Sequence, residues 1–285
     1  MYKPLRLALL ATCFCITSMH SYAQFAHDHF SNMWMRHNWD NPNTDYSRQY
    51  YQRYEMGPSM VFANANLQLT YTLQKKNGEI EDGKLETPIK SKLKGGLNTW
   101  GVIGTSSAKL MEMGEDKILA FGYGGMFNFI SWEVGPLEGA DVLPNAVLFT
   151  APTGEKTLGR SAVSMHVGVP LSLDYKVGAD AILDRGRGMC FTAGAGLYPY
   201  VMLSAWGTFE DVTAKAAPFA KIELGYVLGI AFKVRATVIS GLTYMSERPP
   251  VQGVSNLRVE MKGKPELNLS LLIMPFSYQW EKNRW

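Results

Sequence analysis

The chain has 285 residues and a formal net charge of +3, with 46% hydrophobic residues, 19% charged residues, 27 glycines and 3 cysteines. The apolar content is too high for a disordered chain, and three cysteines are too few for a small disulfide-stapled domain. No apolar run reaches the roughly 18 residues that a membrane-spanning helix needs, so a helical membrane protein is excluded as well. A glycine- and aromatic-rich domain remains, and its composition favours an all-β fold.

The first 23 residues have the layout of a secretory signal peptide. Lys3 and Arg6 give a basic start, residues 7–16 are apolar, and small residues precede a cleavage point after Ala23. Cleavage there would remove two cations, so the net charge becomes 3 − 2 = +1. A nearly neutral chain gives no reason to expect nucleic acid as a partner. The alternative is a lipoprotein signal in which Cys13 is lipidated.

Long stretches of the chain alternate between apolar and polar residues. This period of two covers residues 61–73, 119–129, 163–177, 220–227 and 232–238. Strand side chains point alternately to two faces, so the pattern predicts β-strands with one apolar face. Thirteen residues reach about 43 Å, and at a tilt of about 40° they rise roughly 33 Å, enough to cross the ~25 Å apolar band of an outer membrane. We therefore expect lipid on the apolar faces; the alternative is a soluble sandwich with those faces inward.

Eight segments have the length of a spanning strand: residues 60–73, 97–111, 117–132, 161–177, 189–206, 216–228, 231–244 and 265–280. An even number lets one chain close into an antiparallel up-and-down transmembrane β-barrel without an unpaired edge in lipid. If residues 145–151 and 257–261 also formed a pair of strands, the barrel would have ten strands. The odd-numbered connections are mostly long and the even-numbered ones short, which predicts periplasmic termini, because outer-membrane barrels have long external loops.

The expected organisation is therefore a signal peptide (1–23), a periplasmic N-terminal segment (24–59) and an outer-membrane barrel (60–285). His27 and His29, with Asp28 between them and His37 and Asp40 beyond, are weak candidates for metal ligands, since two histidines at i and i+2 point the same way on a strand. No cysteine or second compact pair stands near them, so we interpret them as part of a polar tail. Neither a metal nor a cofactor is expected.

Seven polar residues fall on the side of their strands that faces away from lipid: His166, Asp174, Lys176, Lys221, Glu223, Lys233 and Arg235. The interior of an eight-stranded barrel is just wide enough for side chains to fill it. The sequence therefore predicts a hydrogen-bonded ionic network in the lumen that leaves no water path. The alternative is a narrow, anion-preferring pore, because four cations stand against two acids.

Ser164 and His166 share one face of a predicted strand. A serine and a histidine displayed in this way serve as nucleophile and base in lipid-modifying barrel enzymes. No third group that would orient the histidine is evident here. We therefore expect no enzymatic activity, and a barrel enzyme is the third interpretation after the structural barrel and the porin-like channel.

Two stretches carry a family resemblance: residues 167–176, which read VGVPLSLDYK, and residues 224–242, which contain LGY, FKVRA and GL in that order. They resemble the PorT-type outer-membrane β-barrel families of the Bacteroidota, whose secreted proteins also carry signals like the one ending at Ala23. The resemblance covers about residues 161–276 and implies an eight-stranded barrel, no enzymatic activity, and partners among envelope or secretion-system proteins besides outer-membrane lipid. Pro275 and the polar residues before Trp285 depart from the usual aromatic end of the last strand.

Overall fold

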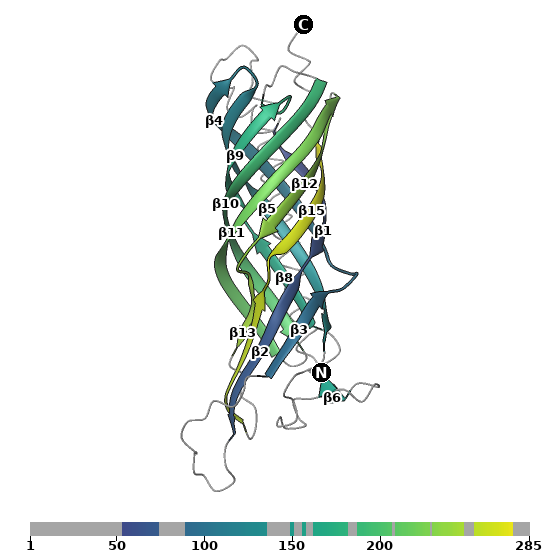
Figure 1. The fold of residues 1–285 in the computed structure, drawn as a ribbon, viewed down its shortest axis with the longest axis vertical. Helices are drawn as coiled ribbons and strands as arrows, with labels where there is room; N and C mark the ends of the chain where they lie inside the picture. The colour runs from purple at the N-terminus through teal and green to yellow at the C-terminus, as the bar shows by residue number, and fades with distance from the viewer. Residues whose placement is uncertain are drawn as a thin grey trace, which may run out of the picture. The chain divides into compact units, whose positions relative to one another are not determined.

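Figure 1 shows the fold in a computed structural model, which describes residues 53–73, 89–135, 149–150, 156–157, 162–181, 187–206, 209–228, 230–247 and 254–275. None of these described residues lies in a helix long and apolar enough to cross a membrane. Thirteen strands form the main sheet: β1 (Glu55–Phe62), β2 (Asn64–Leu73), β3 (Ile89–Gly95), β4 (Trp100–Gly114), β5 (Lys117–Val134), β8 (Ala162–Gly168), β9 (Leu171–Gly178), β10 (Arg187–Trp206), β11 (Phe209–Leu228), β12 (Ile230–Ile239), β13 (Thr243–Glu247), β14 (Val254–Gly263) and β15 (Glu266–Met274).

Several of these strands are successive segments of one longer strand. β1 and β2 are separated only by Ala63 and pair in turn with β15 and β14. β3 and β4 pair with the same strand, β5, on either side of a short interruption at residues 96–99. The thirteen segments thus make eight long antiparallel strands: β1–β2, β3–β4, β5, β8–β9, β10, β11, β12–β13 and β14–β15.

The eight strands close into a ring. The first long strand pairs with the last, as Met60 with Leu269. The stagger of the ring can be measured by going from Phe129 of β5 to its paired residue on the next strand, and so on through all eight strands. This path of outward-facing residues returns to β5 at Leu119, so the strands are staggered by 129 − 119 = 10 residues in total. An even shift keeps inward-pointing side chains inward all round, because successive residues alternate between the two faces. The predicted antiparallel up-and-down barrel of eight strands is confirmed.

The ten-stranded alternative is wrong for the described residues. Residues 257–261 lie within β14, in line with β15 rather than beside it. The other segment, residues 145–151, contains β6 (Phe149–Thr150). This strand pairs with β7 (Lys156–Thr157) in a separate two-stranded sheet. In the described part of either segment, no residue adds a strand to the ring.

Several strand boundaries differ from those predicted. β1 begins at Glu55 rather than at residue 60, and β15 ends at Met274, directly before Pro275. β11 begins at Phe209, which leaves two residues, 207 and 208, for a connection predicted to span 207–215. The acidic and basic residues at the start of β11 are typical of a loop, but polar residues also occur in strands wherever the barrel wall faces water.

The outer wall carries a continuous apolar surface, which we call the apolar belt. Its members are large hydrophobic side chains that point away from the lumen and are exposed: Met60, Phe62, Trp100, Val102, Phe121, Val167, Leu173, Phe191, Ile222, Leu224, Phe232, Val234, Leu269 and Leu271. They lie on every long strand of the ring. Soluble proteins rarely expose apolar surface of this extent, whereas transmembrane barrels face lipid with it.

The two faces of the first long strand are the reverse of those predicted. Ala65, Leu67 and Leu69 of β2 are buried inside the barrel, while Asn64 and Gln68 are exposed. These buried residues join an interior hydrophobic cluster with Leu93, Trp132, Tyr244, Val259 and Met261. β2, β3, β13 and β14, toward the lower end of Figure 1, therefore form a part with an apolar interior and a polar outer wall, which we call the extension. It is built like a water-soluble barrel, and the belt stops where it begins.

Candidate functional site

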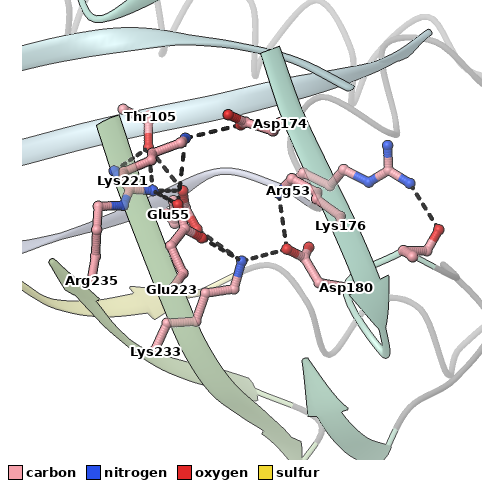
Figure 2. A network of polar contacts seen from close by, with 11 residues as sticks. Arg53, Glu55, Thr105, Asp174, Lys176, Asp180, Lys221, Glu223, Lys233 and Arg235 are labelled. Carbon is pink, nitrogen blue, oxygen red and sulfur yellow. Dashed lines mark hydrogen bonds and ion pairs between the residues drawn. The ribbon is translucent and has the colours of Figure 1, made fainter. Parts of the chain in front are cut away.

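Ten polar side chains gather inside the barrel behind the apolar belt, and we call them the ionic cluster (Figure 2). They are Arg53, Glu55, Thr105, Asp174, Lys176, Asp180, Lys221, Glu223, Lys233 and Arg235, and all ten are buried. Burial of a charge is costly unless it is paired and hydrogen-bonded. The way these groups are paired therefore decides what the lumen does.

Arg235 joins two carboxylates that come from different parts of the ring. It stands directly opposite Glu223 on the neighbouring strand, and its Nη2 lies 2.8 Å from Glu223 Oε1. Glu55 of β1 contacts the same guanidinium and lies 2.9 Å from the Nζ of Lys233. Thr105 accepts from Arg235 at 3.1 Å and donates to Glu55 at 2.9 Å. The first strand is thus bound across the lumen to β12 and, through it, to β11.

The remaining charges continue from this centre in two directions. Lys221 lies 2.9 Å from Asp174 Oδ2 and 3.4 Å from Glu223 Oε1. Asp180, in the turn after β9, accepts from Lys176 at 2.9 Å and from Lys233 at 2.6 Å. Burial alone would raise the pKa of Asp180, but the two ammonium groups outweigh it and hold that pKa well below its ordinary value. The carboxylate therefore stays charged and ties the turn to the lumen.

The structure brings together six of the seven lumen residues named from the sequence, and places His166 elsewhere. It adds Thr105, which lies within a predicted strand, and three charged residues outside the predicted strands: Arg53, Glu55 and Asp180. Arg53 donates to the carbonyl oxygen of Ala181 at 3.3 Å. With these additions five cations face four acids in the ionic cluster, instead of four against two. The excess of positive charge that favoured an anion-preferring pore falls from two to one.

Gly194 makes room for one of these ion pairs. It lies between Lys221 and Asp174 in the register of β10, and a Cβ there would come within 2.2 Å of Asp174 Oδ1 and 3.0 Å of Lys221 Cε. We predict that Gly194→Ala lowers the free energy of unfolding by about 1–3 kcal/mol, the usual cost of overpacking. Urea unfolding in detergent micelles measures it. Gly125→Ala is the control, because nothing lies within 4 Å of a Cβ at that position; equal effects of the two variants would contradict the prediction.

A second buried cluster surrounds Glu266, which is the first residue of β15. Its Oε1 accepts from Asn128 at 2.8 Å and from Asn268 at 2.9 Å, and its Oε2 accepts from the hydroxyl of Tyr244 at 2.8 Å. The Nε2 of His166 lies 3.3 Å from Oε2. The carboxylate is fully buried and is met by four polar groups of the protein, so it needs no water. The alternation of apolar residues at 267, 269, 271 and 273 puts residue 266 on the opposite, lumen side, and this is the signal in the sequence that could have pointed to Glu266.

Ser164 and His166 have separate partners. The hydroxyl of Ser164 lies 2.8 Å from that of Ser204 and accepts from Trp132 Nε1 at 2.9 Å. The Nδ1 of His166 lies 2.9 Å from the hydroxyl of Tyr198. Both side chains are fully buried. The arrangement does not place a nucleophile beside a base, which a barrel hydrolase would need.

A small cavity lies beside the ionic cluster. A cavity of about 10 Å³, lined by Thr105, Ser172, Lys221 and Arg235 among others, is about the size of one water molecule. Beyond it, large side chains such as Tyr198, Met202 and Trp206 fill the interior of the barrel. Within the described residues no group of three or more His, Cys, Asp or Glu is placed to hold a metal; His27 and His29 lie outside those residues.

Comparisons with known proteins give only distant likenesses. No family model matches the sequence, and no curated protein sequence does. Among solved structures, the outer membrane protein OprG from Pseudomonas aeruginosa is 11% identical, with a TM-score of 0.38, covering 78% of this chain and 97% of OprG. The outer membrane protease OmpT from Escherichia coli is 7% identical, with a TM-score of 0.36, covering 77% of this chain and 95% of OmpT. Neisserial surface protein A is 10% identical, with a TM-score of 0.27, covering 75% of this chain and 98% of that protein. At such low scores the assignment of the barrel rests on its strand pairings.

Proposed function

We propose that this chain is an outer-membrane β-barrel protein with a closed lumen, which acts as a structural and interaction component of the envelope. Two features support membrane insertion. The apolar belt offers lipid an apolar outer wall, and the closed ring leaves no backbone edge unpaired in lipid. The observation that carries the closed lumen is the ionic cluster, whose ten side chains are buried and joined across the barrel. A conducting pore would require these groups to face water.

The lengths of the connections support an orientation of the barrel in the membrane. At the end that carries the extension, the connections between the long strands of the ring span residues 74–88, 135–161, 207–208 and 248–253, and two of the four are long. At the opposite end they span residues 115–116, 179–186 and 229, so that none is longer than eight residues. Long loops of outer-membrane barrels are external. We therefore place the extension outside the cell and both termini in the periplasm. Partners from the envelope or from a secretion system, as the PorT-type resemblance implies, would then meet the external loops or the N-terminal segment.

Single-channel recording in planar lipid bilayers tests the closed lumen. We expect no steady conductance from the inserted protein, because the ionic cluster and the aromatic side chains leave no continuous water path. Insertion is checked by gel mobility, since a folded barrel migrates differently before and after boiling. A steady, anion-selective conductance from heat-modifiable protein would establish the porin-like channel in place of the closed barrel.

A further inference from the structure

The outer wall of the extension carries lysine residues on two long strands, β3–β4 and β14–β15, which flank the first long strand on either side. We call this surface the lysine face; it consists of Lys90, Lys92 and Lys94 of β3, Lys262 of β14 and Lys264 just after it, around Asn64, Asn66 and Gln68 of β2. All eight side chains are exposed. Five lysines stand here against two described acids, Glu260 of β14 and, at the edge of the face, Glu133 of β5 opposite Lys94.

Strand register places these lysines around a shared floor. Asn66 stands opposite Lys92 on one side and Lys262 on the other. Asn64 stands opposite Lys94, and its carbonyl oxygen accepts from the backbone of Lys264. Neighbouring strands lie about 4.8 Å apart, so the backbones that carry each flanking pair are roughly 9.6 Å apart. Four flexible ammonium groups therefore surround two side-chain amides. A groove of about 390 Å³ follows this surface, lined by Asn66, Gln68, Lys90, Lys92, Glu260 and Lys262.

Most of this positive charge is not neutralised within the described part of the chain. Glu260 is the acid on the groove, and it is already bound by Lys262 at 3.1 Å and by Arg258. Among the described residues, no carboxylate lies within ion-pair distance of Lys90, Lys92, Lys94 or Lys264. The lysine face thus has the capacity to accept an anion.

The lysine face begins where the apolar belt ends. On the first long strand the exposed Phe62 is followed by Asn64, and on the last the exposed Leu269 is preceded by Lys264. On the second, Leu97 is fully exposed beside Trp100, whose ring centroid lies 5.5 Å from that of Phe127. Aromatic side chains gather at the level of lipid headgroups in membrane proteins. All three strands therefore place the lysine face at the height of the headgroups.

We propose that the lysine face binds the phosphate of a membrane lipid whose acyl chains lie on the adjoining belt. The inference rests on the proposed function, since it requires the barrel to be embedded in a membrane. Lysine binds phosphate as a point charge, and the amides of Asn64 and Asn66 add hydrogen-bond donors. A soluble anion would gain only the polar contacts, whereas a lipid also gains the apolar surface of Phe62 and Leu269 next to them.

Native mass spectrometry of protein released from nanodiscs tests the proposal. The nanodiscs contain phosphatidylcholine alone, phosphatidylcholine with lipid A, or phosphatidylcholine with dephosphorylated lipid A. The wild-type barrel is expected to retain lipid A but not its dephosphorylated form. The variant K92Q/K94Q/K262Q is expected to bind lipid A about a hundredfold more weakly, because each lysine near an anionic lipid surface contributes roughly fivefold. The control K109Q/K117Q/K215Q removes the same charge from exposed positions outside the lysine face and is expected to retain lipid A like the wild type.

Three results would overturn the inference: equal retention of lipid A by the two variants, equal retention of both forms of lipid A, or competition by inorganic phosphate as effective as by lipid A. The phosphatidylcholine arm separates this failure from failure of the proposed function. If the protein inserts there as a heat-modifiable barrel but does not select lipid A, only the proposed lipid site is refuted. If the protein does not insert at all, the proposed membrane barrel is refuted as well.

Discussion

Replacing Glu223 by glutamine is expected to lower the free energy of unfolding by about 3–5 kcal/mol, the cost of leaving buried charges without their partner. Glu223 lies 2.8 Å from Arg235, 3.4 Å from Lys221 and 3.6 Å from Lys233. Glutamine has the same shape but no charge, so the packing is kept while three buried cations lose a shared anion. Reversible urea unfolding in lipid vesicles, followed by tryptophan fluorescence, measures the effect.

Glu210 provides the matched control for this substitution. It lies on the same strand, β11, is only half-buried, and has no ion pair within the described residues. Glu210→Gln should change the free energy of unfolding by no more than about 0.5 kcal/mol, as is usual for positions without such contacts. If both variants unfolded like the wild type, the ionic cluster would not stabilise the barrel, and an open, hydrated lumen would explain the result better.

Period-two alternation is sufficient to predict most of the fold. For residues 163–177 and 232–238 it predicts both the strand and the face, and Asp174 and Arg235 lie in the lumen as this alternation indicates. For residues 61–73 it predicts the strand but the wrong face. Alternation separates two faces of a strand without saying which of them meets water. Leu67 lies inside because β2 belongs to the extension, where the outer wall faces water instead of lipid.

The polar interior is only partly predictable for a related reason. Glu55 precedes the segment whose alternation is recognisable, and Asp180 lies in a turn, so the pattern assigns neither of them to a face. Both are placed by the closure of the ring: Glu55 reaches Lys233 because the first strand closes against the last, and Asp180 reaches it from the turn after β9. Glu266 likewise meets His166 from a strand 100 residues away. Contacts that depend on closure cannot be inferred from local patterns.

Introducing a lysine on the apolar belt should have a large effect only if that wall faces lipid. Val234 is 55% exposed and stands between Leu224 and Leu271, which are also exposed. A lysine near the bilayer midplane costs about 2–4 kcal/mol, so we expect Val234→Lys to lower the free energy of unfolding in lipid vesicles by that amount. Gln68→Lys places the same charge on the outer wall of the extension, beside Lys90 and Glu260. There we expect a change within about 0.5 kcal/mol, because the side chain stays in water.

The contrast between these two variants separates the membrane barrel from the soluble alternative. In a water-soluble protein Val234 would be an ordinary exposed residue, and a lysine there would be tolerated as well as one at position 68. A loss confined to Val234→Lys therefore requires lipid on the belt and water on the extension. Small and equal effects at both positions would show that the exposed apolar wall does not meet acyl chains, and both the membrane topology and the lipid site built on it would have to be abandoned.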